Sequence, residues 1–527
     1  MKPSNSSSAP SSPRTPDELA GTAEEYGMEF LAAVTDDMLD PALVARVPVD
    51  WARSNCLLPV RIAGDACVLT ASPDDVSRQE YLALLIGSEL RPVLAPKDVI
   101  LQGIERCYYS KDDSPHDFLK DMAGPDRAAA TARTDDLLQV AEKAPVTQLV
   151  NLILLEAVKR GASDIHFEPF ESRLRVRHRV DGVLYETASP PKHLEDALVS
   201  RLKVMARMDI AEKRLPQDGM ARVRVGEREI DVRVSTVPVA EGERVVLRLL
   251  DKASALLPME ALGMARATRD TFDSLLTYLN GMIVVSGPTG SGKTTTLYAA
   301  LGKLDASRKN IITIEDPIEY QLTNIGQIQV KPKIGLTFAS GLRHILRQDP
   351  DIILVGETRD IETAEIAVRA SLTGHLVFTT LHTNDAPGAV VRLIDMGIEP
   401  YLLASCLRGV LAQRLVRKLC PECRRQTVLS EDDLSGLGQL TEQVRGRKVW
   451  TPAGCPACLE GYRGRVGLFE LMVLDREMQE RVTRGHAGTE GLRALAEQKG
   501  MTSLLADGVA KVLDGATSLA EVVSVAA

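Results

Sequence analysis

The sequence has no long uninterrupted apolar run. No stretch of its 527 residues reaches the roughly 18 consecutive apolar residues that a membrane-spanning helix needs. The N-terminal segment MKPSNSSSAPSSPRTP also has no apolar core of the kind that marks a secretory signal. We therefore expect a cytoplasmic protein with no direct membrane insertion, whose contacts with a membrane are made through a partner.

The sequence also has no excess of basic charge and few aromatic side chains. It holds 63 Lys and Arg against 72 Asp and Glu, which gives a net charge of -9, and only 4% of its residues are aromatic. Nucleic-acid-binding proteins usually carry a basic surface and aromatic side chains on which bases stack. The composition therefore argues against a nucleic-acid partner.

Cysteine is scarce outside one cluster. Four of the eight cysteines are scattered, and we expect them to be buried thiols in a reducing compartment: Cys56, Cys67, Cys107 and Cys406. The others form two CxxC pairs with 31 residues between the pairs: Cys420 with Cys423, and Cys455 with Cys458. Four thiolates suit a tetrahedral Zn²⁺ and leave no open position. We predict a structural zinc site, with an excursion of the chain between the two pairs.

Composition and patterning divide the chain into six segments. Residues 1–24, rich in Ser and Pro, are expected to be a disordered tail. Residues 25–112 are expected to be globular, 113–143 a polar linker, 144–250 a small α+β domain, and 251–268 a second linker. From 269 to 527, short apolar strands alternate with helices, which is typical of a buried, largely parallel sheet.

The α+β segment predicts an arginine-rich sheet face. A helix is expected from Pro145 to near Gly161. In RLRVRHRV the apolar residues alternate with arginines, and Asp181-Gly182 follows as a turn signal. The arginines are Arg173, Arg175, Arg177 and Arg179. Two readings stay open: a solvated charged face, or a surface that meets a phosphate or a neighbouring subunit.

The segment GMIVVSGPTGSGKTTTLYAAL is expected to form a strand, a glycine-rich loop and a helix. It fits G-x-x-x-x-G-K-[ST] in full, and backbone N–H groups of such a loop converge on phosphate oxygens. Lys293 would reach the β- and γ-phosphates of ATP, and the Thr294 hydroxyl would bind Mg²⁺. The expected nucleotide-binding residues are Gly287, Pro288, Thr289, Gly290, Ser291, Gly292, Lys293, Thr294 and Thr295.

Two acids and two histidines are expected at strand ends near this loop. Glu315 ends NIITIE and Glu357 follows PDIILVG, where a carboxylate could handle metal and water. The alternative is that both are solvated acids. His375 and His382 bracket the strand LVFTTL, and the pairing favours a functional over a structural role.

Three arginines are candidates for stabilising charge on the γ-phosphate. Arg343 and Arg347 are one helical turn apart, and Arg359 lies two residues after Glu357. Ordinary surface ion pairs explain the same arginines equally well, and the sequence leaves both readings open.

Residues 145 to 527 resemble the secretion ATPase superfamily of type II secretion and type IV pili. The resemblance is carried by the P-loop, IITIEDPIEY, LRQDPDIILVGETRD, GHLVFTTLHTNDA and the paired cysteines. RVDGVL, GERVVLRLLD and LRGVLAQRLVRKLC favour the type II secretion branch, known as GspE. The implied fold is α/β: a RecA-like P-loop ATPase domain at 269–527, preceded by a PAS-like α+β domain and an N-terminal docking domain. The zinc-binding insert would span 418–460, and the C-terminal helical part 466–527.

The resemblance also implies roles. Glu315 maps to the proposed water-activating acid, Glu357 to the Walker B acid, and His375 and His382 to the histidine box. Arg343, Arg347 and Arg359 map to arginines needed for turnover, and Arg465 lies in GRVGLFE, which is similar to a family motif. A homo-hexamer is implied, whose N-terminal domain docks on an inner-membrane component of the secretion platform.

Two departures stand out. Met220 replaces the family's arginine after QDG, which puts one phosphate or subunit contact in doubt unless Arg222 substitutes, and Thr358 stands where isoleucine is usual. No cyclic-di-GMP-binding pattern is recognised in the N-terminal domain.

The sequence therefore predicts an ATP-hydrolysing motor that powers pseudopilus assembly and protein export by type II secretion. The alternatives are a type IV pilus assembly ATPase, a nucleic-acid translocase and a non-hydrolysing scaffold. The composition counts against the translocase. The intact Lys293, Thr294, Glu315 and Glu357 count against the scaffold.

Overall fold

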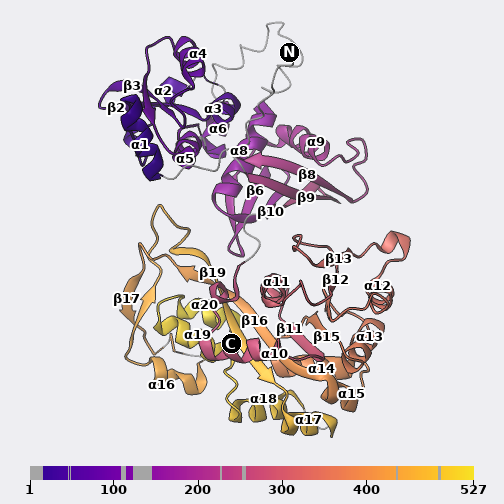
Figure 1. Ribbon diagram of the computed structural model, residues 1–527. Coiled ribbons are helices and arrows are strands. Elements are labelled where there is room, and N and C mark those ends of the chain that lie inside the picture. Colours follow the sequence, from indigo (N-terminus) through magenta and orange to yellow (C-terminus); the bar gives the residue numbers. More distant parts are fainter. Residues whose placement is uncertain are drawn as a thin grey trace, which may run out of the picture. The chain divides into compact units, whose positions relative to one another are not determined.

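A computed structural model describes residues 16–44, 47, 49–108, 114–122, 145–225, 228–251, 257–431, 433–434, 437–484 and 488–526. The chain separates into two compact units, one of residues 1–156 with 187–201 and one of residues 157–186 with 202–527. Figure 1 shows the elements of both units. Among the described residues, no helix is long and apolar enough to cross a membrane.

The first unit is built on a small four-stranded sheet with the order β1-β4-β3-β2. Its strands are β1 (Glu29–Phe30), β2 (Leu57–Ile62), β3 (Asp65–Thr70) and β4 (Arg91–Leu94). Its helices are α1 (Pro16–Tyr26), α2 (Pro41–Val44), α3 (Val49–Asn55), α4 (Val76–Ile86) and α5 (Lys97–Tyr108). Buried side chains of β2, β3, β4 and α5 form one apolar core.

Helix α1 corrects the predicted disordered tail. Residues 16–24 lie inside this helix, whose Leu19 and Ala23 are one turn apart and are buried with Leu94. The Ser and Pro content that suggested disorder is concentrated before Pro16, in residues outside the described part.

Three further helices are assigned wholly or mostly to the first unit. They are α6 (Pro115–Met122), α8 (Pro145–Lys159) and α9 (Glu195–Met205). Helix α6 forms within the predicted linker 113–143, most of which lies outside the described residues. Helix α8 begins at Pro145 as predicted, and Gly161 follows it with a φ of +65°.

A six-stranded sheet follows, with the order β7-β6-β5-β10-β9-β8. Its strands are β5 (Ala162–Pro169), β6 (Leu174–Val180), β7 (Val183–Ala188), β8 (Gln217–Val225), β9 (Arg228–Val239) and β10 (Gly242–Asp251). Strand β6 alternates strictly between buried and half-buried residues, and Asp181 and Gly182 both have positive φ in the turn to β7. The predicted alternation and turn are therefore confirmed.

On the arginine-rich face of this sheet, the arginines pair with carboxylates. Glu168, on β5, is buried and accepts hydrogen bonds from Arg175 at 3.0 Å, Arg177 at 2.6 Å and Arg244 at 2.7 Å. Burial alone raises the pKa of Glu168, but hydrogen bonds from Arg177 and Arg175 outweigh it and hold the pKa below its usual range. The face is thus an ion-pair network and not a row of separate solvated charges.

The ATPase-like part is a seven-stranded sheet with the order β13-β12-β14-β15-β11-β16-β19. Its strands are β11 (Gly281–Ser286), β12 (Ile311–Glu315), β13 (Gly326–Gln329), β14 (Ile352–Val355), β15 (Leu376–Leu381), β16 (Leu407–Leu419) and β19 (Tyr462–Val473). All neighbouring strands pair in parallel except β16 and β19. Every residue of β11, β12, β14 and β15 is buried, which confirms the expected buried, largely parallel sheet.

Helices cover both faces of this sheet (Figure 1). Helices α10 (Arg266–Leu275) and α11 (Lys293–Lys303) contribute to the core on one face. The core on the other face draws on α12 (Phe338–Ile345), α13 (Ile361–Leu372), α14 (Ala386–Asp395), α15 (Pro400–Cys406), α17 (Arg476–Thr483) and α18 (Thr489–Gln498). Helices α19 (Leu504–Leu513) and α20 (Leu519–Ala526) pack on β16 and β19.

The expected excursion between the cysteine pairs is an antiparallel hairpin with a helical segment. Strands β17 (Arg425–Val428) and β18 (Lys448–Thr451) pair with each other, and α16 (Thr441–Val444) precedes β18. Arg424 stacks over the Trp450 ring at 4.5 Å and donates to Gly515 O at 2.6 Å, which anchors the hairpin.

Candidate functional site

The P-loop joins β11 to α11 as the sequence predicts. Gly287 has a φ of +150°, and a Cβ there would lie 2.5 Å from Gln413 O and 2.6 Å from Ser291 Oγ. Gly292 has a φ of +87° and caps α11, which begins at Lys293. Only glycine fits these two positions, because one is crowded and the other left-handed. The N-terminus of α11 is therefore free to present backbone N–H groups to an anion.

Lys293 folds back over this loop. Its Nζ donates to Gly287 O at 2.7 Å and to Pro288 O at 3.0 Å. Burial lowers the pKa of Lys293 to about 8, while Glu357 acts to raise it and Arg414 to lower it. The ammonium group is thus still mostly charged at neutral pH, and its hydrogen bonds to loop carbonyls can be exchanged for phosphate oxygens.

Glu357 follows the carboxyl end of β14, and β14, β15 and β11 are neighbours in the sheet. Because these strands are parallel, their carboxyl ends share one edge of the sheet with the P-loop. The side chain is 12% exposed; one oxygen lies 2.5 Å from Arg359 Nη2 and the other 3.6 Å from His382 Nε2. The structure therefore brings together three predicted residues: Glu357, Arg359 and His382.

Threonines of β15 hold the Glu357 segment in place. Thr380 Oγ1 donates to Gly356 O at 2.6 Å, and Thr358 N donates to Thr380 O at 3.1 Å. The hydroxyls of Thr358 and Thr379 lie 2.7 Å apart, both buried. Thr358, which stands where isoleucine is usual, thus makes a buried hydrogen bond that an isoleucine side chain could not make.

The structure places other predicted residues away from this cluster. His375 precedes β15, at the opposite edge from His382, and its Nδ1 lies 2.8 Å from Ala370 O. Arg343 pairs with Glu362 at 2.5 Å, and Arg347 donates to Arg343 O at 2.9 Å. Among the described interactions of a single chain, none of these three residues contacts the P-loop.

Glu315 is buried beneath the surface and not at it. Its side chain accepts hydrogen bonds from Tyr298, from Thr313 at 2.5 Å and from Gln327 at 3.1 Å, and the residue is 4% exposed. The water-activating role implied for it stays a prediction. Glu319, four residues later, lines an open cleft and is not among the residues predicted from the sequence.

This cleft has a volume of about 1050 Å³ and lies between the six-stranded sheet and the segment after β12. One wall carries Met220, Arg222 and Arg233, and the other is formed by residues 316–321. Arg233 Nη2 donates to Ile318 O at 3.4 Å, and Arg222 Nε donates to Asp231 at 2.8 Å. Arg222 therefore lines the same cleft as Met220, the residue that stands in place of the family's arginine.

Two polar residues of β16, Gln413 and Arg414, were not predicted from the sequence, and one of them contacts the P-loop. Gln413 is buried, and its Nε2 donates to Ser291 O at 2.6 Å. Arg414 donates to Asn384 O at 2.8 Å, just after His382 in sequence. The sequence LAQRLV does not predict these contacts, because the strand register is needed to place Gln413 beside the loop.

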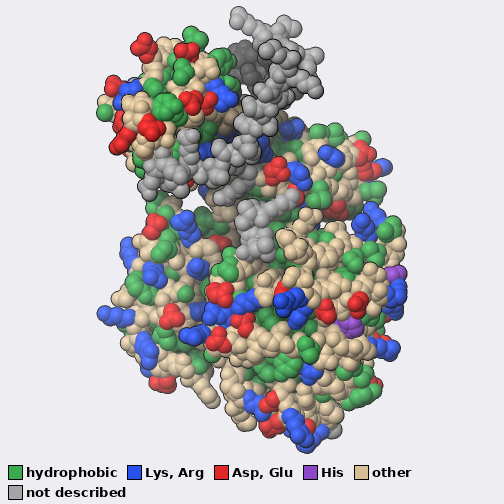
Figure 2. All heavy atoms as spheres, viewed as in Figure 1, with side chains coloured by type: hydrophobic (Ala, Val, Ile, Leu, Met, Phe, Trp, Pro, Cys, Tyr) green, Lys and Arg blue, Asp and Glu red, His purple; other side chains and the backbone are tan. Residues whose placement is uncertain are grey.

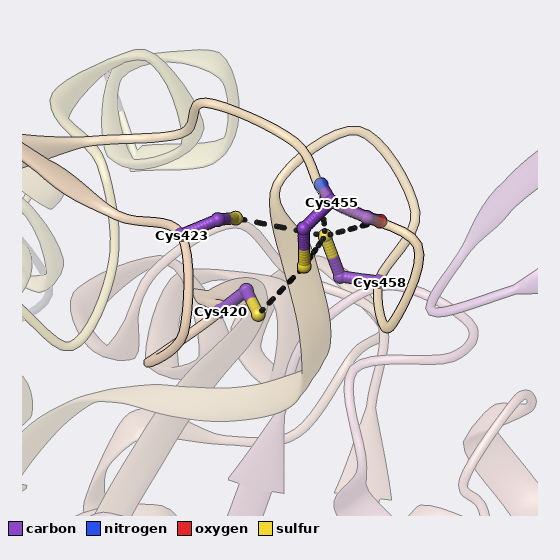
Figure 3. A group of neighbouring side chains, drawn as sticks. All are labelled: Cys420, Cys423, Cys455 and Cys458. Atoms are coloured by element: carbon purple, nitrogen blue, oxygen red, sulfur yellow. Dashed lines mark hydrogen bonds between the residues drawn. The ribbon is translucent and has the colours of Figure 1, made fainter.

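The four predicted zinc ligands converge on one point (Figure 3). Their sulfur atoms all lie within 4.8 Å of one another, with 3.9 Å between Cys420 and Cys455 and 3.7 Å between Cys423 and Cys458. A tetrahedral Zn²⁺ with bonds of about 2.3 Å separates its sulfur ligands by about 3.8 Å. The cluster therefore fits a zinc ion by both donor type and spacing.

Arg465, from the motif GRVGLFE, lies near the turn of the six-stranded sheet. Its Nε is 3.6 Å from Asp181, whose carboxylate also accepts a hydrogen bond from Gly464 N at 2.7 Å. On the face shown in Figure 2, acidic and basic side chains are interspersed.

Two family models match the chain. Residues 139–524 match the family described as type II/IV secretion system protein, and residues 26–114 match the MshEN domain. The first match covers the six-stranded sheet, the P-loop and the four cysteines.

Curated relatives match over most of their length. The chain is 48% identical over 495 residues to type II secretion system protein E of Dickeya dadantii, covering 92% of this chain and 98% of the relative. It is 44% identical over 508 residues to the type IV pilus assembly ATPase PilB of Myxococcus xanthus, covering 95% and 89%.

Among solved structures, the fold is similar to that of the Legionella pneumophila ATPase DotB. The TM-score is 0.52 at 21% sequence identity, covering 71% of this chain and 94% of that one. This likeness concerns the fold alone. The P-loop geometry and the family match over residues 139–524 lead to one conclusion: this chain belongs to the type II/IV secretion system protein family and is a P-loop ATPase.

Proposed function

We propose that this ATPase is the motor that powers pseudopilus assembly and protein export in a type II secretion system. One observation carries the proposal: an intact P-loop and Glu357 share a sheet edge in a chain that aligns with 98% of a type II secretion system protein E. The relatives named as protein E supply the substrate class, and the site supplies the chemistry.

Each residue of the edge has a task in hydrolysis. Lys293 and the N–H groups at the start of α11 bind phosphate oxygens, which replace Gly287 O and Pro288 O as partners of the ammonium. Glu357 orients and polarises the attacking water, and Arg359 and His382 fix the direction of its carboxylate. Thr294 would hold Mg²⁺, which supplies charge stabilisation at the phosphates when bound.

The assembly is proposed to be a homo-hexamer on the cytoplasmic face of the inner membrane. Arg343 and Arg347 make no contact with their own P-loop among the described interactions. In the hexamer, one of them would instead reach the P-loop of a neighbouring subunit. The N-terminal unit would dock on an inner-membrane component of the platform.

The test is Glu357→Gln in the full-length protein. ATP binding is expected to stay within about threefold of wild type, while turnover falls by about 10²-fold or more, because the amide cannot act as a base. Phosphate release measures turnover, and a fluorescent nucleotide measures binding. Wild-type turnover in this variant would contradict the role of Glu357.

Replacing the chromosomal gene with the Glu357→Gln allele tests the biological role. Loss of exported enzymes from the culture medium, with surface pili unchanged, is the expected result. Glu365→Gln is the control, since Glu365 is exposed and pairs with Arg369, which has no role in the proposed site.

A pilus assembly ATPase is the second candidate, because the PilB relative aligns with 95% of this chain. Loss of pili with export unchanged in the same strain would select it over type II secretion.

The cysteine cluster is proposed to hold one structural Zn²⁺ per chain. Metal analysis of protein purified without chelator should find about one zinc per chain, and Cys423→Ser should lose it. The loss should lower the melting temperature of the β17–β18 hairpin region more than it slows ATP turnover. Zinc-free protein with full stability would contradict the proposal.

A further inference from the structure

A buried cluster of hydrogen bonds lies between the P-loop helix and the end of β12. Tyr298, on α11, is 1% exposed and donates its hydroxyl proton to Glu315. Burial, with Glu315 beside it, raises the pKa of Tyr298, so the phenol stays protonated and acts as a donor. With Thr313 and Gln327 also donating, both carboxylate oxygens of Glu315 are occupied by neutral donors.

Gln327 extends this cluster to the segment that follows β12. Its Nε2 also donates to Tyr320 O at 3.0 Å, and its Oε1 accepts from Leu322 N at 2.7 Å. The Tyr320 ring meets the Tyr298 ring edge to face, with centroids 6.3 Å apart. The backbone of residues 320–322 is therefore held directly against the P-loop helix.

The segment that follows β12, residues 316–322, places two acidic side chains at the cleft. Asp316 and Glu319 both line the cleft, while Glu315, the last residue of β12, is buried. Tyr298 lies five residues after Lys293 on the same helix. Tyr298 and Gln327 thus connect α11 to the backbone that places these two acids.

We propose that Glu315, Tyr298 and Gln327 form a positioning cluster that couples the P-loop helix to the acidic segment 316–319, and that Glu315 is not the base that activates water. A base must reach the proton it removes, and Glu315 would have to give up its three hydrogen bonds and leave a buried position to do so. The proposal deepens the ATPase function and rests on it.

The test compares Tyr298→Phe and Gln327→Met with Tyr401→Phe in the full-length protein. Tyr401 is 57% exposed, so its variant removes a hydroxyl outside the cluster. Each cluster variant should lower kcat by about tenfold with KM for ATP within twofold, because nucleotide contacts persist while the acids are misplaced. The double variant should lose less than the product of the single losses, since both act through one cluster.

Two further measurements separate positioning from other roles. Amide hydrogen exchange in residues 316–322, above all at Leu322, should speed up in the cluster variants and not in Tyr401→Phe. The acid limb of the kcat–pH profile should stay in place in Tyr298→Phe. If Glu315 were the base, loss of a donor to its charged form would move that limb to higher pH.

Three results would overturn the inference: a shifted acid limb, unchanged kcat, or a lower kcat without faster exchange in 316–322. Wild-type protein that fails to hydrolyse ATP would instead count against the ATPase function, so the two failures are distinguishable.

Discussion

The six-stranded and seven-stranded sheets use opposite solutions for their two faces. Strand β6 alternates buried residues with arginines, and the charges of its polar face are balanced by ion pairs with Glu168. Strands β11, β12, β14 and β15 are buried on both faces, so no side chain within them is available for chemistry. Function in the seven-stranded sheet is therefore confined to its carboxyl edge, whereas the six-stranded sheet can present a whole face.

This contrast predicts that edge substitutions change activity without changing stability. Lys293→Ala should lower ATP turnover by about 10³-fold or more, because the loop loses the ammonium group that folds over it. Unfolding in urea should remain close to wild type. Lys303→Ala, at the other end of α11 and paired with Asp273, is the matched control and should keep its activity. Equal loss of turnover in both variants would contradict the edge assignment.

Face substitutions in the six-stranded sheet should do the reverse. Glu168→Ala leaves Arg175, Arg177 and Arg244 without their shared carboxylate, and should destabilise this sheet by about 3 kcal/mol or more. Hydrogen exchange of β5 and β6 measures the effect. Glu186→Ala removes an exposed partner of Arg173, 3.7 Å away, and should cost about 0.5 kcal/mol or less. Similar costs for the two variants would show that the network adds nothing.

Acid should weaken the six-stranded sheet through its apolar face. His178 is fully buried, and burial lowers its pKa to about 4, so it is neutral in the folded protein at neutral pH. The unfolded chain binds a proton below about pH 6.5, so stability falls as the pH drops from about 6.5 to about 4, by up to about 3 kcal/mol.

His178→Leu should remove that part of the acid sensitivity. The comparison is hydrogen exchange of β6 at pH 7 and pH 4.5 in both proteins, corrected for the intrinsic pH dependence of exchange. Carboxylates titrate in both proteins, so their contribution cancels in this comparison. An identical pH dependence in the two proteins would refute the assignment to His178.

Local patterns were sufficient where neighbours in sequence determine the structure. The P-loop, the start of α8 and the alternation in β6 each depend on residues a few positions apart, and the structure has them as predicted. The tail prediction failed for residues 16–24, because the burial of Leu19 and Ala23 with Leu94 involves a residue about 70 positions away.

The acids show the same limit within the site. Glu315 and Glu357 both end apolar strands, and nothing in either pattern distinguishes a solvent-facing carboxylate from a buried one. The difference depends on Tyr298 and Gln327, which approach Glu315 from another helix and another strand. Likewise, His375 and His382 form a pair in the sequence but lie at opposite ends of β15.

The sequence by itself determined the fold class, the phosphate-binding loop and the four cysteines that cluster, because each depends on the spacing of residues along the chain. Only the tertiary structure decided which of the strand-end residues meet at the P-loop, that Glu315 is enclosed by three donors, and that Gln413 supports the loop from β16. The physical reason is that these contacts join residues that strand order and helix packing bring together across long sequence separations.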